Sequence, residues 1–161
     1  DIQVRLLALL ADDGIKSLII KEYIPFLNRK INEYLNAMDF FIGLKFDESF
    51  NESFTSMNKT NFSYNNLSKG QRCRLNLAIW LALLEVASMK NSMVTNLLCL
   101  DEILEPLDED GMKLFVNLTN TLLHDKNLFV ISQRFKELED YFKSSIQFEL
   151  VNDFTEMIKD D

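Results

Sequence analysis

The sequence is poor in glycine, proline, cysteine and histidine, with four, two, two and one of them among 161 residues. Its glycines are Gly14, Gly43, Gly70 and Gly111, and none lies in a G-x-x-x-x-G-K-[ST] pattern. This absence excludes a phosphate-binding loop of that kind from the chain, because the loop needs glycines at fixed positions to bring backbone amides close to a phosphate. A phosphate loop, if one is used, must come from another segment or chain.

Long apolar runs and leader-like segments are also missing. The richest apolar run, Leu77 to Leu84, is flanked by Asn76 and Glu85 and is far shorter than the roughly 18 to 20 residues of a membrane span. No secretory leader is recognisable, and Cys73 and Cys99 have no partner at metal-ligand spacing. We therefore expect a soluble, cytoplasmic protein with buried free thiols. Because the chain opens at Asp1 on a helical pattern, we expect it to be part of a longer protein.

What the chain does contain is enough apolar sequence for one packed domain, with 47% hydrophobic and 26% charged residues. The net charge of −8 is uneven: residues 101–161 carry fifteen acidic against six basic residues, whereas residues 1–100 carry ten against eleven. Tight DNA binding by this chain alone is not expected. Any DNA contact should favour the N-terminal part, although a solvated helix face explains the same basic residues equally well; they are Arg5, Lys16, Lys21, Arg29 and Lys30.

The N-terminal third is predicted to be helical. Residues 1–11 are typical of the end of a helix, and apolar residues from Ile15 to Met38 recur three or four apart, which predicts a second helix with one buried stripe. Pro25 should kink or restart that helix. Short alternating pieces between Phe40 and Tyr64 predict two or three half-exposed antiparallel strands.

The remainder alternates strands with helices. Residues 69–90 predict a helix that is apolar nearly all round and therefore buried. The runs Leu97 to Leu100 and Asn127 to Ser132 predict buried parallel strands covered on both faces, separated by a helix at 109–124. A short helix at 135–143 and a last strand at 146–151 follow. This order predicts an α/β core with parallel strands.

The acidic pair Asp101 and Glu102 directly follows the first of these strands. Ligands in such folds sit beyond the carboxyl ends of the parallel strands. One carboxylate there can hold Mg²⁺, usually through water, and the next can polarise a water for attack on a γ-phosphate. An isolated acidic pair can equally well begin a solvated loop.

A second candidate, Leu67-Ser68-Lys69-Gly70-Gln71, stands about 30 residues upstream at the start of the predicted buried helix. Ser68 can cap the helix, and Gly70 lets a phosphate approach the backbone amides at the positive end of the helix dipole. Lys69 adds a positive charge. Taken alone, Ser68 could be an ordinary N-cap.

Together, the 67–71 segment, the long helix, the strand ending in Asp101-Glu102 and the Pro106-Leu107-Asp108 segment resemble, in order, the signature motif, Walker B and D-loop of an ABC-type ATPase. The resemblance spans about residues 64 to 135. The helix leading into a strand hairpin resembles the place where the coiled coil re-enters the head of an SMC-like repair ATPase. Within that group the SbcC type is the best match, and the large subunit of a phage recombination nuclease would suit the sequence.

The resemblance implies an ABC-type ATPase head, C-terminal lobe, in which residues 1–40 form the coiled-coil base and entry helix and residues 41–161 form the lobe. It implies ATP and Mg²⁺ as cofactors, with Mg²⁺ on Asp101, Glu102 as the catalytic base and Asp108 reaching across a dimer interface. The signature residues would contact the γ-phosphate held by a second head; they are Ser68, Lys69, Gly70 and Gln71. The partners implied are the N-terminal lobe carrying Walker A, a second head in a homodimer, a nuclease subunit and, through the complex, DNA.

Two departures from the family pattern bear on mechanism. Lys69 replaces the first glycine of the signature, and Gln133 stands where the family places a switch histidine after the second parallel strand. An amide can donate a hydrogen bond to a phosphate but cannot take the proton or charge roles of imidazole. The only histidine, His124, ends a predicted helix and is expected to have a helix-terminal or surface role.

Three functions remain open from the sequence. The first is an ATPase that dimerises around ATP and regulates a nuclease on DNA ends, with Arg72 and Arg74 as candidate relays of nucleotide state or, alternatively, plain surface cations. The second is the nucleotide-binding subunit of a transporter, which the long helical entry and absent phosphate loop disfavour. The third is a structural or tethering module that keeps the fold without hydrolysis, for which Gln133 is the best support.

Overall fold

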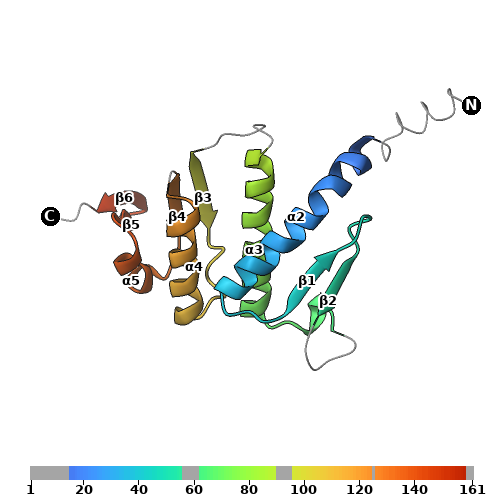
Figure 1. Ribbon diagram of the computed structural model, residues 1–161. Coiled ribbons are helices and arrows are strands. Elements are labelled where there is room, and N and C mark those ends of the chain that lie inside the picture. The colour runs from blue at the N-terminus through green and yellow to red at the C-terminus, as the bar shows by residue number, and fades with distance from the viewer. Residues whose placement is uncertain (1–14, 56–61, 90–95, 125, 159–161) are drawn as a thin grey trace, which may run out of the picture.

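A computed structural model describes residues 15–55, 62–89, 96–124 and 126–158 (Figure 1). The helix predicted over residues 1–11 lies outside this described part. In chain order the elements are α2 (Ile15–Ala37), β1 (Gly43–Phe46), β2 (Glu52–Thr55), the 3₁₀ turn η1 (Tyr64–Asn66), α3 (Lys69–Met89), β3 (Leu97–Asp101), α4 (Glu109–Leu122), β4 (Asn127–Ile131), α5 (Phe135–Leu138), the 3₁₀ turn η2 (Glu139–Tyr141), β5 (Gln147–Val151) and β6 (Phe154–Ile158).

Helix α2 runs obliquely across α3 and continues through Pro25 (Figure 1). Of the predicted kink or restart at this proline, the restart does not occur. Pro25 is exposed, so the carbonyl on the preceding turn that loses its amide partner can be hydrated instead. The buried stripe of Leu27, Ile31 and Leu35 holds the helix against the rest of the core. Packing of that stripe outweighs the lost hydrogen bond, because most helical stability in proteins comes from burial of an apolar face.

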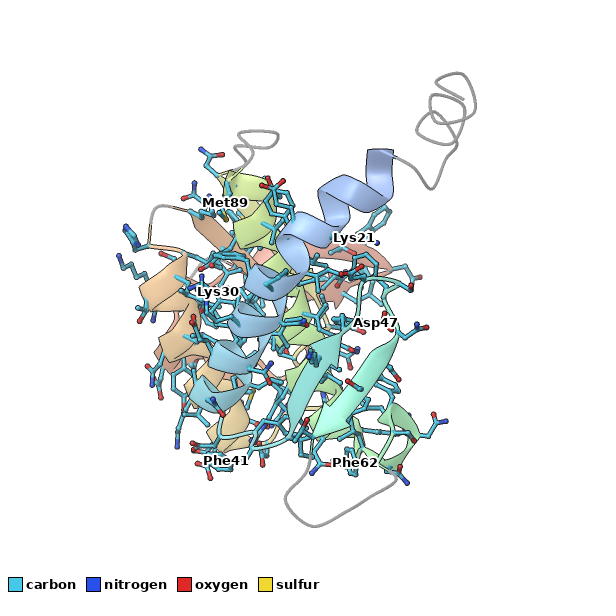
Figure 2. The ribbon with its side chains drawn as sticks, turned by 45° about the vertical axis from the view of Figure 1, so that its right-hand side comes forward. Lys21, Lys30, Phe41, Asp47, Phe62 and Met89 are labelled. Carbon is cyan, nitrogen blue, oxygen red and sulfur yellow. The ribbon has the colours of Figure 1, made fainter. Side chains whose placement is uncertain are left out.

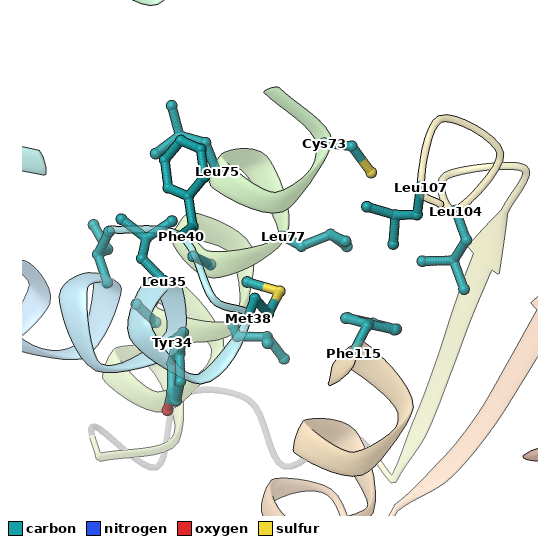
Figure 3. Close-up of a cluster of buried hydrophobic side chains, with 14 of the residues drawn as sticks. Tyr34, Leu35, Met38, Phe40, Cys73, Leu75, Leu77, Leu104, Leu107 and Phe115 are labelled. Atoms are coloured by element: carbon teal, nitrogen blue, oxygen red, sulfur yellow. The ribbon is translucent and has the colours of Figure 1, made fainter. Parts of the chain in front are cut away.

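The core lies where α2, α3 and α4 meet (Figure 3). Met38, which follows α2, and Phe115 of α4 are both fully buried, and Leu77 of α3 belongs to the same cluster. Leu104 and Leu107, from the segment between β3 and α4, are buried in the same cluster. The loop that follows the acidic pair is therefore anchored by its leucines in the centre of the protein.

A group of polar contacts, here called the polar clasp, joins α2 to α3 through Tyr34, Lys30 and Glu85. The hydroxyl of Tyr34 donates to the carboxylate of Glu85, and the ammonium of Lys30 lies 3.3 Å from the other oxygen of Glu85 and 2.9 Å from Glu33. Burial, followed by the neighbouring Glu85, raises the pKa of Tyr34 well above its usual range. The raised pKa keeps the hydroxyl of Tyr34 protonated at neutral pH, so it remains a donor to Glu85.

Two asparagines on consecutive turns of α2 hold the β1–β2 hairpin. Asn28 exchanges hydrogen bonds with the backbone N–H and carbonyl of Phe46, at 2.8 and 2.9 Å. Asn32 does the same with Leu44, at 3.0 and 2.7 Å. The side chains thus replace a neighbouring strand on the outer edge of β1 and leave no open edge there. Figure 2 shows the hairpin along α2, with Asp47 at its turn and Lys21 on the helix beside it.

Strands β3 and β4 pair in parallel, with Asp101 opposite Ile131, which confirms the predicted α/β core. The prediction that both strands are covered on both faces is wrong for this chain. Leu98 and Leu100 are buried, whereas Leu97, Phe129 and Ile131 are 50%, 53% and 56% exposed. The hydrophobic run is uninterrupted in sequence, but the described part of the chain supplies a cover for only one side of the sheet.

Two further expectations need correction. Cys73 is buried, but Cys99 points to the open face of β3 and is exposed, so only one thiol is buried as predicted. Helix α3 buries residues such as Leu75 and Leu81, yet Leu83 and Met89 are 47% and 59% exposed. Helix α3 therefore carries apolar side chains on more faces than the described residues bury. Within the described residues, no helix has the length and apolar character needed to cross a membrane.

Strand β5 follows the predicted last strand closely, but β6 was not predicted. The two pair as an antiparallel hairpin in which Val151 lies opposite Phe154. Asn152 and Asp153 form its turn with φ values of 49° and 64°, the left-handed conformation that asparagine and aspartate tolerate best. This two-residue turn between apolar runs is the sequence signal from which β6 could have been found.

Candidate functional site

Asp101 and Glu102 lie at the carboxyl end of β3, as the sequence predicts. Asp101 is the last residue of the strand, and Glu102 leaves it with a φ of 51°. A glutamate rarely adopts this left-handed backbone conformation. The N–H of Glu102 donates to the carbonyl of Ile131, the last residue of β4, at 2.9 Å. This bond fixes the turn, and both acidic side chains remain exposed beyond the strand ends.

Gln133 brings an amide from the neighbouring strand to the same place. Its Nε2 atom donates to Oε1 of Glu102 at 2.8 Å. Parallel strands β3 and β4 end at the same edge of the sheet, so residues that follow each of them meet in space although 31 positions separate them in sequence. The arrangement brings together the two residues for which the sequence suggests a role in hydrolysis, a carboxylate and a neutral hydrogen-bond donor.

Sequence reasoning missed a second connection between the two loops. Oε1 of Glu105 accepts from the hydroxyl of Ser132 at 2.6 Å and from the backbone N–H of Gln133 at 3.2 Å. Nη1 of Arg134 donates to the carbonyl of Leu107 at 2.6 Å. Neither Glu105 nor Arg134 belongs to a pattern that predicts such contacts. Only the pairing of β3 with β4 shows that their loops are neighbours.

The 67–71 segment forms the start of α3, and Ser68 caps it. The N–H of Gln71 donates to Oγ of Ser68 at 3.2 Å, and the N–H of Ser68 donates to the side chain of Gln71 at 3.0 Å. This reciprocal pair is a capping box. Ser68, Lys69 and Gln71 are exposed, so the amino terminus of the helix is open to a docking surface.

Gly70 has a packing role that the sequence does not reveal. A Cβ atom at this position would lie 3.1 Å from the carbonyl oxygen of Pro106. The thiol of Cys73, one turn further along, donates to the carbonyl of Ile103 at 3.2 Å. The amino terminus of α3 therefore lies directly against the 102–108 loop, and a side chain at position 70 would push the two apart.

Asp108 caps α4 and pairs with Arg74. Its Oδ1 accepts from the N–H of Gly111 at 2.9 Å and lies 2.7 Å from Nη2 of Arg74. The guanidinium of Arg74, followed by the Gly111 amide, lowers the pKa of Asp108. Asp108 is thus the N-cap of α4, while its contact across a dimer interface stays a prediction. Gly111 leaves room for this pair, since a Cβ there would lie 2.6 Å from Oδ1 of Asp108.

The two candidate relay arginines have different surroundings. Nη1 of Arg74 donates to the carbonyl of Met38 at 3.0 Å, so this side chain links the end of α2, helix α3 and Asp108. Arg72 lies over the ring of Tyr64, 5.2 Å from its centroid, and donates to the carbonyl of Asn65 at 3.1 Å. Both are engaged with the protein, which argues against plain surface cations.

The remaining candidates are His124 and the basic residues of the N-terminal part, and none of those that the structure describes lies at the carboxyl ends of β3 and β4. Nδ1 of His124 lies 3.4 Å from the carbonyl of Thr121 at the exposed end of α4, in the helix-terminal position expected for it. Among the candidate DNA-contacting residues, Arg5 lies outside the described residues, as does the side chain of Lys16. Lys21 pairs with Glu48, and both Arg29 and Lys30 pair with Glu33. These pairs favour the solvated helix face.

The residues present are compatible with Mg²⁺ but do not form a complete metal site. No cluster of three or more histidine, cysteine, aspartate or glutamate side chains is placed to hold a metal within the described ranges. Asp101 offers one exposed carboxylate at the strand end. Mg²⁺ usually keeps several waters and binds through one or two carboxylates plus substrate phosphates, so a single protein ligand is consistent with its chemistry.

In sequence, the chain is similar to exonuclease subunits of phages. No family model matches the chain. The chain is 34% identical to exonuclease subunit 2 of Enterobacteria phage T4 over 151 residues, which is 93% of this chain and 27% of that protein. It is 35% identical to exonuclease subunit 2 of Escherichia phage RB69 over 150 residues, 92% of this chain and 26% of that protein. The chain thus spans about a quarter of the length of these relatives.

Comparison with solved structures gives the fold. A structure from work on the ATP-driven dimerization and DNA-stimulated activation of SMC ATPases superposes with a TM-score of 0.70 at 14% identity, covering 88% of either chain. The SMC head domain from Thermotoga maritima superposes with a TM-score of 0.62 at 18% identity, covering 91% of this chain and 51% of that one. The ABC-type head fold and the resemblance to SMC-like ATPases expected from the sequence are confirmed.

Proposed function

We propose that this chain is the C-terminal half of a DNA-recombination and repair ATPase. Two findings support the proposal: the sequence is similar to phage exonuclease subunit 2, and the fold is that of an SMC ATPase head. In this proposal the assembled protein dimerises around ATP and regulates a partner nuclease on DNA ends. The contact between Gln133 and Glu102 at 2.8 Å is the observation on which the proposal chiefly depends. It puts a hydrogen-bond donor and a carboxylate side by side at the edge of the sheet where such folds bind ligands.

Glu102 is the proposed general base or water-orienting residue. Its carboxylate is exposed at the strand end and accepts the amide of Gln133. A water bound on the free side of this carboxylate would be polarised for attack on a terminal phosphate. Gln133 can donate its N–H either to Glu102 or to a phosphate oxygen, so it can hold the carboxylate in place before nucleotide binds.

Asp101 is the proposed Mg²⁺ ligand, and its position at the end of β3 supports this role. When bound with ATP, Mg²⁺ neutralises charge on the phosphate oxygens. The proposed role of Asp101 is to hold its carboxylate near the phosphates, where it would bind the ion directly or through water. The phosphate loop must be supplied by a second lobe, since no such pattern is present in this sequence.

The uncovered face of the β3–β4 sheet also supports the proposal that a second lobe packs against this chain. Leu97, Phe129 and Ile131 present apolar side chains that the described residues leave exposed. The β5–β6 hairpin, which is a separate sheet, also exposes apolar side chains, with Phe148 and Phe154 at 62% and 71% exposure. Soluble proteins rarely leave contiguous apolar faces of this kind uncovered. The relatives are roughly four times as long as this chain, which leaves ample sequence for an N-terminal lobe to cover the face.

The amino terminus of α3 is the proposed contact with a second head. Ser68, Lys69 and Gln71 are exposed there, and the dipole of the helix favours an anion at its amino terminus. In the proposal, this terminus with Gly70 binds the terminal phosphate of ATP held by the other head. Lys69 replaces a glycine of the family pattern, and its ammonium adds charge at the same point.

Helix α2 is the proposed route from the nucleotide to the coiled coil. Residues 1–40 would form the coiled-coil base and residues 41–161 the lobe. The Arg74 contact to Met38 and the clasp of Tyr34 with Glu85 tie α2 to α3, so closure of two heads on α3 would move α2 with it. That movement would control how a bound nuclease reaches DNA ends.

A specific observation keeps a second function in view. Gln133 occupies the position of the family's switch histidine, and its amide is bonded to the proposed base. A head that binds ATP and dimerises without hydrolysing it would be a tethering module of the same fold. The relatives and solved structures, which are exonuclease subunits and SMC heads, favour either of these functions over a transporter subunit.

Measurement of ATP turnover separates the two functions. The full-length protein, or this chain complemented by its phosphate-loop lobe, should lose about 10²- to 10⁴-fold in kcat on Glu102→Gln, because a general base is removed. ATP-dependent dimers should persist in that variant. Turnover that is measurable in the wild type and unchanged in Glu102→Gln would remove Glu102 from its role, and absence of turnover in the wild-type assembly would favour the tethering module.

A further inference from the structure

Glu105 occupies a position between the acidic pair and Asp108 to which none of the family motifs assigns a role. It is half-buried, and one oxygen of its carboxylate accepts both the hydroxyl of Ser132 and the backbone N–H of Gln133, at 2.6 and 3.2 Å. Hydrogen bonds to an ionised acceptor are stronger than those between neutral groups. Glu105 therefore fastens the turn that follows β4 to the loop that follows β3.

Arg134 reinforces the same turn from its other side. Its backbone N–H donates to Oγ of Ser132 at 3.0 Å, so the Ser132 hydroxyl is held between Arg134 and Glu105. Its guanidinium donates to the carbonyls of Glu105 and Leu107, at 3.3 and 2.6 Å, and pairs with Glu137. Five hydrogen bonds thus join or brace the two loops around the backbone of Gln133.

The side chain of Gln133 needs such a support. A glutamine has three rotatable bonds where a histidine has two, and it loses more rotamer freedom when it is held in one conformation. With its backbone N–H bound to Glu105, the amide still reaches Oε1 of Glu102 at 2.8 Å. Placing the backbone fixes the start of the side chain, which leaves fewer conformations in which the amide misses the site.

We infer that Glu105 is a positioning residue for the hydrolytic step, acting through the turn at Ser132 to aim the Gln133 amide at the site shared with Glu102. The inference deepens the proposed function and rests on it. Glu105 touches neither nucleotide nor reacting water in this role. It should therefore affect the rate of the step in which Gln133 takes part more than the affinity for ATP.

The first test measures kcat and KM for ATP in the assembled, full-length ATPase. Glu105→Ala should lower kcat about tenfold, the effect of losing one or two charge-assisted hydrogen bonds, and leave KM within about twofold. Glu105→Gln keeps an acceptor oxygen of the same reach and should restore most of the rate. Glu139→Ala, which removes an exposed carboxylate from the nearby turn η2, is the matched control and should leave kcat unchanged.

The second test asks whether Glu105 acts through Gln133. In a Gln133→Ala background, Glu105→Ala should lower kcat by less than about twofold, because residues that act as a unit have non-additive effects. A full, independent tenfold loss in that background would overturn the inference and assign Glu105 a purely structural role. Ser132→Ala removes the hydroxyl that Glu105 accepts, and it keeps the test decisive if Glu105→Ala fails to fold.

The reference variant Glu102→Gln separates the failure of this inference from the failure of the proposed function. Should Glu102→Gln retain full turnover, the proposed hydrolytic site is wrong, and the role of Glu105 with it. Should Glu102→Gln lose turnover while Glu105→Ala and Ser132→Ala keep the wild-type kcat, only the role of Glu105 is wrong. A lower kcat in all three, with additivity absent in the double variant, is the expected result.

Discussion

Arg74 of helix α3 and Asp108, the N-cap of α4, form an ion pair. Nη2 of the arginine lies 2.7 Å from Oδ1 of the aspartate. The other terminal nitrogen of Arg74 donates to the carbonyl of Met38 at the end of α2. One side chain thus joins helix α3, the residue that caps α4 and the end of helix α2. Its side chain is only 16% exposed, so these contacts are largely shielded from solvent.

Replacement of Arg74 tests this junction. Arg74→Ala should lower the free energy of unfolding by about 1–3 kcal/mol, because a hydrogen-bonded carbonyl and a charged carboxylate lose their donor together. Arg74→Lys should recover only part of the loss, since an ammonium cannot reproduce the two-pronged geometry of guanidinium. Urea unfolding measures both. Lys113→Ala, which removes an exposed pair with Glu109 on α4, should leave the free energy of unfolding almost unchanged. Equal effects of Arg74→Ala and Lys113→Ala would contradict the junction.

Asp108 should make stability depend on pH. Its pKa in the folded protein is lowered, first by Arg74 and then by the Gly111 amide, so its stabilising contribution is present above the unfolded pKa of about 3.9 and is lost as pH falls through the lower, folded pKa. Asp108→Asn keeps a capping side chain but removes this titration. Wild-type stability should therefore fall more steeply than that of Asp108→Asn below about pH 4 in denaturant unfolding series. Parallel curves would remove Asp108 as a source of acid sensitivity.

Ser68 should be critical for head-to-head association. Ser68→Arg places a long side chain on the exposed amino terminus of α3 and should abolish ATP-induced dimers of the assembled protein while leaving the fold intact. Analytical ultracentrifugation with and without ATP is the measurement. Ser88→Arg, at the opposite end of the same helix, is the matched control and should dimerise normally. Normal dimers in Ser68→Arg would argue against the signature contact in trans.

Gln133 offers a test of the switch position. Gln133→His introduces an imidazole whose ordinary pKa is about 6.5, so kcat should acquire a pH dependence between about pH 6 and 7 that the amide cannot produce. The variant should keep a rate within about tenfold of the wild type at pH 8, because a neutral imidazole can also donate one hydrogen bond. The kcat–pH profile of both proteins decides the matter. Identical profiles would show that residue 133 takes no part in the rate-limiting step.

Much of the fold could be predicted from the sequence. The helix predicted over residues 69–90 is α3 (Lys69–Met89), and the strand predicted from Leu97 is β3 (Leu97–Asp101). Apolar spacing and capping residues are local signals, so they fix the type of an element and most of its length. The same signals failed where the outcome depends on non-local cover, as on the open face of β3 where Cys99 is exposed.

The candidate site divides in the same way. Residue order alone put Asp101 and Glu102 after one strand and Gln133 after the next. The parallel pairing of these strands then places the three residues at a common edge. Glu105 and Arg134 escaped prediction, because their partners lie 27 or more residues away and the contacts depend on how two loops fold against each other. The tight approach of Gly70 to Pro106 was equally invisible in the sequence.

The sequence by itself determined most of the helices and strands, with β6 as an exception, and it determined the order in which the chemically competent residues appear. These are consequences of short-range periodicity and capping. Only the tertiary structure decided that Glu105 supports the turn of Gln133 and that Arg74 joins three elements. Parallel pairing of β3 with β4, and packing of α2 on α3, bring together side chains that no local pattern relates.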